Sequence, residues 1–171
     1  MIPEKLKGFM CYDDGEKMIG VADVTLPSFA AMTDTIGGAG ILGEIDTPAV
    51  GNFGSMTTTI NWRSLVEENV IYIAPNTYQF DFRGSVQIYD QNGLEFGSRA
   101  VKVVMKAIPK TVNLGSFSTA STMGASGEFE LIYILITIEG RPMVELDKLS
   151  YKFIVNGVDY TAKLRQDIGL S

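Results

Sequence analysis

Acidic pairs are the residues of this chain whose types and spacing come closest to a catalytic set. They are Asp13-Asp14, Glu67-Glu68, and Glu128 with Glu130. We expect the first pair in a turn, the second on a helix surface and the third on one face of a strand, whereas a glycosidase needs two carboxylates that face each other across a sugar. The chain has no histidine, so the commonest general base is missing and no serine triad can form. An enzyme is therefore the least favoured interpretation.

Other sites of chemistry are equally poorly supported. The single cysteine, Cys11, excludes an intrachain disulfide and a multi-cysteine metal site, and we expect it half-buried on the first strand. The segment Gly37-Gly38-Ala39-Gly40 lacks the Lys-Ser/Thr that follows the glycines of a P-loop. The sequence thus predicts no catalytic residue, no cofactor and no metal.

Composition indicates one folded domain spanning residues 1–171. Hydrophobic residues make up 46% of the chain, and no apolar run reaches the roughly 18 residues of a membrane span. The N-terminus lacks the apolar core of a signal peptide, so we expect assembly in the cytoplasm and no membrane association of the monomer. A net charge of −6 disfavours non-specific binding to nucleic acid.

Alternation of polar and apolar residues with period two dominates the chain and predicts strands. The clearest case is 77–89, followed by the turn Asp90-Gln91-Asn92-Gly93 and a return strand to residue 108, where Pro109 interrupts it. Further strands are expected at 9–12, 17–24, 55–61, 128–139, 143–155 and 158–165. One helix is expected at about 62–74, capped by Asn61 and ended by Pro75, with an apolar stripe packed on the sheet. The fold class is therefore mainly β, antiparallel, with one packed helix.

The segment 33–56 is unusual because it contains six glycines together with regularly spaced aliphatic residues. Loops of this length inside a compact domain are uncommon and usually functional or disordered, and disordered linkers are poor in apolar residues. We interpret it as a loop that buries its apolar side chains against another protein subunit. The Ser/Thr/Gly/Ala-rich segment 114–127 is expected to be a mobile loop.

Several stretches in order resemble one family. GVADVTLPSFAAMTDTIGGAGILGEIDTP (20–48), GNFGSMTTTINWR (51–63), YQFDFRGSVQIYD and FIVNGVDYTAKLRQDIG are similar to the major tail tube proteins of contractile phages of the P2-like type. Tubes of R-type bacteriocins and, more distantly, of type VI secretion systems are similar too. The order and spacing of these stretches over nearly the whole chain carry the resemblance, because each is short.

The resemblance implies an antiparallel β-sandwich or partly closed barrel that assembles as six-membered rings. The rings would stack into a hollow tube inside a contractile sheath, with baseplate and tape-measure proteins as further partners. Such a tube belongs to a virion tail or an extracellular phage-tail-like particle, and DNA would pass through it without specific binding. The inter-ring stacking residues implied in the long loop are Ile36, Gly38, Gly40, Ile41, Leu42, Ile45, Val50 and Phe53.

Acidic side chains in the polar registers of long strands lead to a hypothesis about the channel. If they face the lumen, they would repel the phosphates of passing DNA. The candidates are Asp81, Glu95, Glu128 and Glu130. Ordinary solvated surface charge explains each one equally well, and Arg83 or Arg99 could pair with them.

Two alternatives to a phage-type tube stay open at this point. A type VI-like secretion tube subunit differs in assembly context rather than in the monomer. A β-sandwich binding module would need exposed aromatic residues on a groove, whereas most Phe and Tyr residues here alternate into strands. The sequence leaves undecided whether the particle is a phage or a bacteriocin, which strands face the lumen, the host, and whether the free protein is a monomer.

Overall fold

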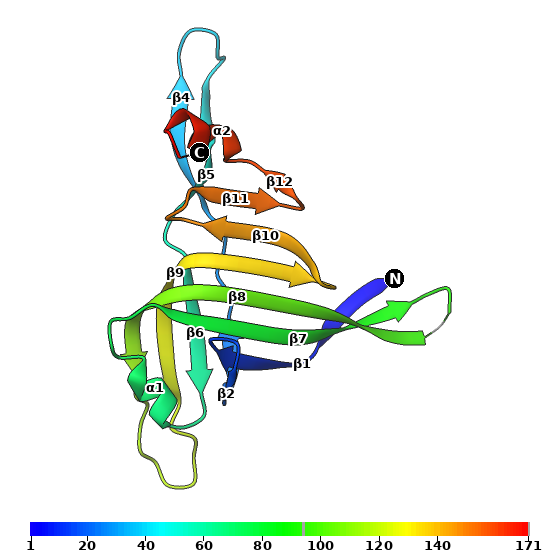
Figure 1. The fold of residues 1–171 in the computed structure, drawn as a ribbon, viewed down its shortest axis with the longest axis vertical. Coiled ribbons are helices and arrows are strands. Elements are labelled where there is room, and N and C mark those ends of the chain that lie inside the picture. The colour runs from blue at the N-terminus through cyan, green and yellow to red at the C-terminus, as the bar shows by residue number, and fades with distance from the viewer. Residues whose placement is uncertain (94, 171) are drawn as a thin grey trace.

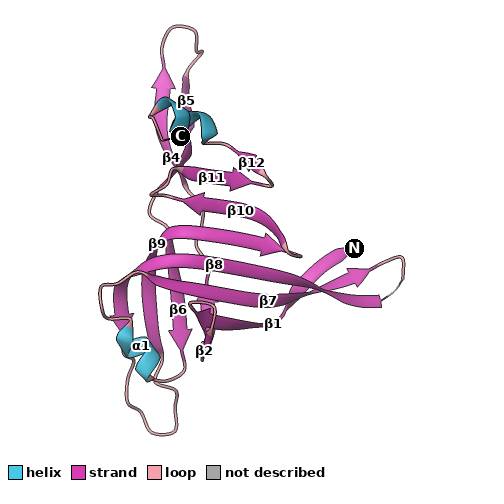
Figure 2. Ribbon diagram, in the orientation of Figure 1, coloured by secondary structure: helices cyan, strands magenta, loops and turns pink. Residues whose placement is uncertain are grey.

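Strands make up most of this computed structural model, which describes residues 1–93 and 95–170 (Figures 1 and 2). The strands are β1 (Ile2–Asp13), β2 (Lys17–Ile19), β3 (Asp23–Thr25), β4 (Ala31–Gly37), β5 (Glu44–Phe53), β6 (Thr57–Trp62), β7 (Tyr78–Asp90), β8 (Glu95–Asn113), β9 (Ala125–Ile138), β10 (Arg141–Asp147), β11 (Lys152–Val155) and β12 (Val158–Asp159). The helices are α1 (Glu67–Ile71) and α2 (Ala162–Asp167). No described helix is long and apolar enough to cross a membrane.

The main sheet is antiparallel, with the order β12-β11-β10-β9-β8-β7-β1-β2. Strand β9 branches it, because its first half pairs with β6 and its second half with β10, while β8 runs along its other side. Strand β3 pairs with β6, and Val24 and Leu26 of this layer face Phe82 of β7 across an apolar groove. The expected mainly antiparallel β fold is confirmed, and within the described residues the sheet does not close into a barrel.

Aromatic side chains fill the core between these layers. The ring centroids of Phe80 and Phe129 are 4.9 Å apart, and Tyr72 packs edge-on against Phe80 at 5.3 Å. Trp62 stacks on Tyr72 at 6.0 Å. All four side chains are buried. The period-two pattern that predicted β7 therefore correctly placed Phe80 on the core face.

The expected helix at 62–74 is wrong in its bounds and in its buried face. Strand β6 continues through Trp62, because Thr58, Ile60 and Trp62 alternate into the core, and Asn61 pairs within the sheet instead of capping a helix. Helix α1 begins after Val66, whose N–H donates to Oδ1 of Asn69. Trp62 and Asn69 of the expected stripe are buried, as predicted, but Val66, Val70 and Ile73 of the same stripe are exposed.

Several strand predictions also need correction. The predicted strand 17–24 is divided into β2 and β3, and the predicted strand 143–155 is divided into β10 and β11. Strand β8 passes Pro109 and continues to Asn113, since a register shift between Pro109 and Thr111 accommodates the missing N–H. The predicted strand at 158–165 is only two residues long, and the chain then turns into helix α2.

The expected loop at 33–56 is largely a two-stranded hairpin. Strands β4 and β5 pair only with each other, with Ile36 opposite Ile45, and project from the body at the top of Figure 1. Apart from Ile41, the β-branched residues of the segment lie in these strands, while Gly38, Gly40 and Gly43 form the tip with positive φ. The glycines that indicated a loop are thus mostly the turn and its neighbours.

Candidate assembly surfaces

The β4–β5 hairpin carries a group of exposed apolar side chains. Ile36 and Ile45 are 43% and 50% exposed and face the same side as cross-strand neighbours, while Leu42 at the tip is fully exposed. Val50, nearer the base, is also exposed. Isolated exposed apolar residues are ordinary, but a group on one projecting element is typical of an interaction site.

Of the residues predicted for stacking, Phe53 is placed differently. Its ring packs edge-on against Phe153 of β11 at 5.0 Å and against Phe29 at 5.5 Å. Phe53 therefore anchors the base of the hairpin within its own protomer, and its apolar ring is not free for a neighbouring subunit. The structure places Ile36, Gly38, Gly40, Ile41, Leu42, Ile45 and Val50 on the projecting part of the hairpin.

The base of the hairpin rests on the C-terminal residues, which the sequence did not indicate as functional. The backbone of Gly51 lies so close to Thr161 that a Cβ on Gly51 would be 2.5 Å from Thr161 Cγ2. Thr161 Oγ1 accepts from the N–H of Phe153 at 2.9 Å and from Arg165 Nη1 at 3.1 Å. Asp159 pairs with Arg165 at 2.5 Å. The hydrogen bond from Arg165 is the main reason that the pKa of Asp159 is lowered to about 2, against burial, which raises it.

The opposite end of the molecule also exposes apolar residues. Helix α1 and the 114–124 connection lie at the bottom of Figure 1, at the far end of the long axis from the hairpin. The exposed apolar residues there are Val66, Val70, Ile71, Ile73, Leu114 and Phe117. Phe117 alone is 92% exposed. Only the helical spacing of Val66, Val70 and Ile73 signalled a shared face in the sequence, and that face is exposed rather than buried.

Asp81 does not present a free carboxylate. It is 3% exposed, and its Oδ2 atom is 2.8 Å from Nη2 of Arg83 and 3.2 Å from Nζ of Lys102. The Arg83 guanidinium also donates to the carbonyl of Gly15 and lies over the ring of Tyr12. Asp81 is therefore a buried, paired charge, and the hypothesis that it repels DNA from an open surface is wrong for this residue.

Glu128 and Glu130 lie on the outward face of β9, but neither stands alone. Lys110 is 3.4 Å from Glu128 and 3.7 Å from Glu130, and Lys148 is 3.8 Å from Glu130. Burial raises the pKa of Glu130, but hydrogen bonds from Ser55 Oγ and the N–H of Met56, together with the charges of Lys148 and Lys110, lower it by more. The pKa of Glu130 therefore lies below its ordinary value. Both carboxylates thus lie beside lysines on one polar face.

Glu95 lies on the opposite face of the sheet from Asp81. In the strand register, Glu95 lies directly opposite Asp90 at the end of the β7–β8 hairpin. The register continues without a shift from there to Asp81, which lies opposite Val104. Because side chains alternate along a strand, Asp90 and Asp81 point to opposite faces. The four acidic candidates therefore do not all lie on one face of the sheet.

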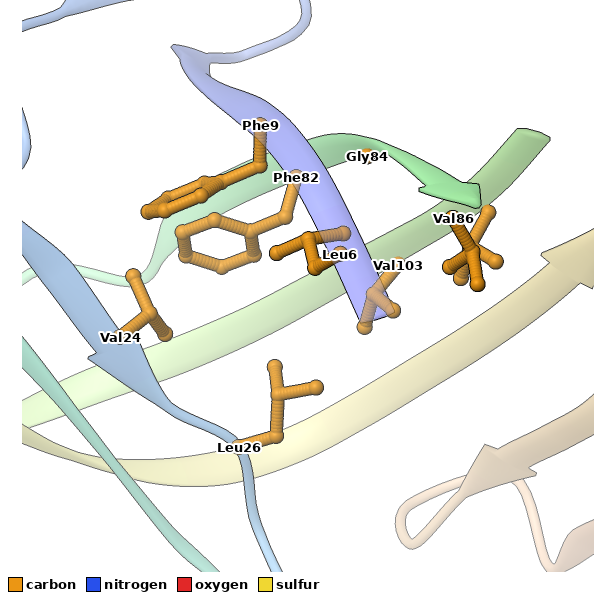
Figure 3. A pocket seen from close by; sticks show the side chains of 9 residues that line it. Leu6, Phe9, Val24, Leu26, Phe82, Gly84, Val86 and Val103 are labelled. Carbon is orange, nitrogen blue, oxygen red and sulfur yellow. The ribbon is translucent and has the colours of Figure 1, made fainter. Parts of the chain in front are cut away.

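An apolar groove opens between β1, β3, β7 and β8 (Figure 3). Phe9, Phe82, Leu6, Val24 and Leu26 point toward one another there, and Gly84 leaves room for Leu6, since a Cβ would lie 2.9 Å from Leu6 Cδ1. No lining side chain can exchange a proton or bind a metal.

Cys11 lies in β1 and is buried. Burial is the main cause that raises the pKa of its thiol to about 12, and the charges of Asp13 and Asp81 raise it as well. It is therefore no candidate for a nucleophile. Within the described residues, no group of three or more His, Cys, Asp or Glu residues could hold a metal ion.

Comparison with known proteins shows the family to which this chain belongs. A family model described as phage tail tube protein FII matches residues 3–169. The chain belongs to this family. The tail tube protein of Escherichia phage P2 is 27% identical over 179 aligned positions, which cover 99% of each chain.

One solved structure shares the fold of this chain, and a second is less similar. The PVC sheath/tube terminator of an extracellular contractile injection system, in its extended state, has a TM-score of 0.57 at 13% identity over 80% of this chain and 98% of that chain. The PVC sheath-tube complex gives a TM-score of 0.49 at 15% identity over 80% and 91%. The resemblance seen in the sequence to phage tail tube proteins is confirmed, and the family indicates a structural rather than a catalytic role.

Proposed function

We propose that this tail tube protein forms six-membered rings that stack into the hollow inner tube of a contractile phage tail or a tail-like particle. The observation that carries the proposal is the projecting β4–β5 hairpin, which holds Ile36, Leu42 and Ile45 away from the body of the protomer. Burial of each such side chain against a neighbour would contribute about 1.5–3 kcal/mol. Six hairpins acting together at one ring junction would make the tube stiff.

Stacking in one direction needs two different surfaces at opposite ends of the protomer. The hairpin lies at one end of the long axis, and α1 with the 114–124 connection lies at the other (Figure 1). Both ends expose apolar side chains, represented by Leu42 and Phe117. In the proposed tube, the hairpin of one ring contacts the α1 end of a protomer in the next ring.

Ring closure needs an interface around the circumference, and the sheet offers one. Strand β1 pairs with β7 along one side, but only Cys11, Tyr12 and Asp13 pair with β2 on the other. The outer edge of β1 before Cys11 is thus unpaired, and an unpaired edge is a template for another strand. At the far side, β12 is only two residues long. We propose that neighbouring protomers cover these edges when the ring closes.

The polar face bearing Glu128 and Glu130 is proposed to face the channel. Lys110 and Lys148 are paired with these carboxylates, as Arg83 and Lys102 are with Asp81. A surface whose cations are already paired offers few free positive charges to phosphate. The proposed role of the acids is therefore to neutralise nearby lysines, so that DNA passes without adhering; in a DNA-free bacteriocin this role would lapse. Sheath, baseplate and tape-measure proteins are the proposed partners outside and at the ends of the tube.

The test is electron microscopy of the purified chain over a range of concentrations, alone and added to baseplates from the same particle. Six-fold hollow rings or tubes in either sample are the expected result. A chain that stays monomeric in both samples would overturn the proposal. A companion sample with Leu42→Asp should form rings at most, because the apolar tip is lost while the ring-closing edges are intact.

A further inference from the structure

The β4–β5 hairpin is attached to the body at few points. Its strands pair only with each other, and single-chain segments before β4 and after β5 join it to β3 and β6. At the neck, the N–H of Gly54 donates to the carbonyl of Ala30 at 2.9 Å, and Lys148 Nζ donates to the carbonyl of Gly54 at 3.0 Å. These two bonds hold the neck but leave the direction of the hairpin to other contacts.

Two such contacts are with the C-terminal part of the chain. Gly51 lies against Thr161, and Phe53 packs on Phe153, which in turn lies 5.9 Å from the ring of Tyr160. Figure 1 shows α2 beside the lower part of the hairpin. Residues about 100 positions later in the sequence thus support the base of the hairpin. We call Phe153, Tyr160 and Thr161 the seat of the hairpin.

This seat is itself held rigidly. Thr161 is 3% exposed, and its N–H donates to Oδ1 of Asp159 at 3.0 Å. Arg165 joins Asp159, Thr161 and the carbonyl of Tyr151 through one guanidinium. Charge-assisted hydrogen bonds from a planar guanidinium fix direction as well as distance. The turn before α2 is therefore fastened both to its own helix and to the start of β11.

We propose that the C-terminal segment Val158–Gly169 is a clamp that sets the direction of the hairpin, with Gly51 and Thr161 as its positioning residues. The proposal rests on the proposed stacking function and adds that stacking depends on residues outside the inter-ring contact. A strand rises about 3.3 Å per residue, so the tip lies roughly 25 Å beyond Gly51 and a 10° rotation at the base moves it by about 4 Å. Such a shift would move Leu42 out of any pocket built for it.

Gly51→Ala is the variant that tests the clamp, because its Cβ would collide with Thr161 Cγ2. Gly51 has φ +78°, so alanine there is also strained. Gly140→Ala is the matched control: Gly140 has φ +75° in the β9–β10 turn, and a Cβ there would meet no atom within 4 Å. We expect Gly51→Ala to lower the yield of assembled tubes at least tenfold and Gly140→Ala to leave it within about twofold.

A rescue separates positioning from general destabilisation. Thr161→Ser removes the Cγ2 methyl but retains Oγ1, so the double variant Gly51→Ala with Thr161→Ser should recover at least part of the lost assembly. The direction of the hairpin can be measured in the monomer by spin labels on Ala39→Cys and Ser150→Cys, since Cys11 is 1% exposed and stays unlabelled. The distance distribution should broaden or shift in Gly51→Ala and remain narrow in Gly140→Ala.

The results distinguish the clamp from the function on which it rests. If Gly51→Ala assembles as well as Gly140→Ala and gives an unchanged distance distribution, the clamp is wrong and stacking by the hairpin is unaffected. If Leu42→Asp also forms normal tubes, the hairpin is not the stacking element. Loss of assembly in Gly51→Ala without recovery in the double variant, and with an unchanged distance distribution, would likewise overturn the clamp.

Discussion

Two hairpins of this protein are built alike but placed differently. The β7–β8 hairpin is flanked by β1 on one side and β9 on the other, so its core face is covered and Phe80 is fully buried. Among the strands that the structure describes, none flanks the β4–β5 hairpin, and its apolar residues are exposed. Both consist of two antiparallel strands paired along their length. Their surroundings, rather than their own sequences, separate a core element from a projecting one.

The difference explains how one chain can be both stable and ready to assemble. An isolated two-stranded hairpin is marginal in water, so β4–β5 depends on contacts at its base. The β7–β8 hairpin carries the stability of the domain, and β4–β5 carries apolar surface without contributing much to it. Substitutions should therefore separate unfolding from assembly according to which hairpin they alter.

The largest effect is expected from Phe80→Ala in β7. Phe80 packs against Tyr72 and Phe129 with no exposed surface, so truncation leaves a cavity in the aromatic core. We expect the free energy of unfolding to fall by about 3–5 kcal/mol. Urea denaturation followed by tryptophan fluorescence would measure it. Phe117→Ala, at a position 92% exposed, is the control and should change stability by less than about 0.5 kcal/mol.

An intermediate effect is expected from Asp81→Asn on the other face of β7. The substitution keeps the shape but removes the charge that pairs with Arg83 and Lys102. Both cations are partly exposed and can turn to water. The free energy of unfolding should therefore fall by about 1.5–3 kcal/mol, less than for a fully buried ion pair. Calorimetry of the variant beside Glu95→Gln, an exposed carboxylate, would show the difference; equal melting temperatures would contradict it.

The sequence predicted the covered hairpin well and the exposed one poorly, for a physical reason. Alternation in β7 reflects one face in the core and one outside, which period two reports directly. In β4–β5 both faces are exposed, so Thr35, Ile36 and Ile45 give no such pattern and the glycines of the tip dominate. The contact between Gly51 and Thr161 joins residues far apart in sequence, and no local pattern can indicate it. Pairing of Asp81 with Lys102 was hidden for the same reason.

A smaller effect should appear at the base of β4–β5 as the pH falls. The pKa of Asp159 in the folded protein is about 2, below its ordinary value of 3.8. The stability that its pairing with Arg165 contributes is therefore complete above about pH 4 and is lost as the pH falls through 2. Hydrogen exchange, with each rate compared to the intrinsic rate of an unstructured amide at the same pH, should show lower protection at residues 159–165 and 51–53 near pH 2.5 than at pH 5, with little change in β7. Asp159→Asn should remove this pH dependence; a dependence that persists would contradict the assignment.

The smallest effect on folding is expected from Leu42→Ser at the tip of β4–β5. Leu42 is fully exposed and contacts nothing in its own protomer that could lose packing, so the free energy of unfolding should stay within about 0.5 kcal/mol. Assembly should nevertheless fall, because in the proposed tube this side chain is buried against the next ring. Sedimentation velocity of the variant beside wild type would measure assembly, and urea denaturation would measure folding. A variant that loses stability and assembly together would show that the tip serves the fold of its own protomer, and the contrast between the two hairpins would then fail. If only assembly falls, the exposed hairpin acts on a neighbouring protomer, which is what its lack of any flanking strand implies.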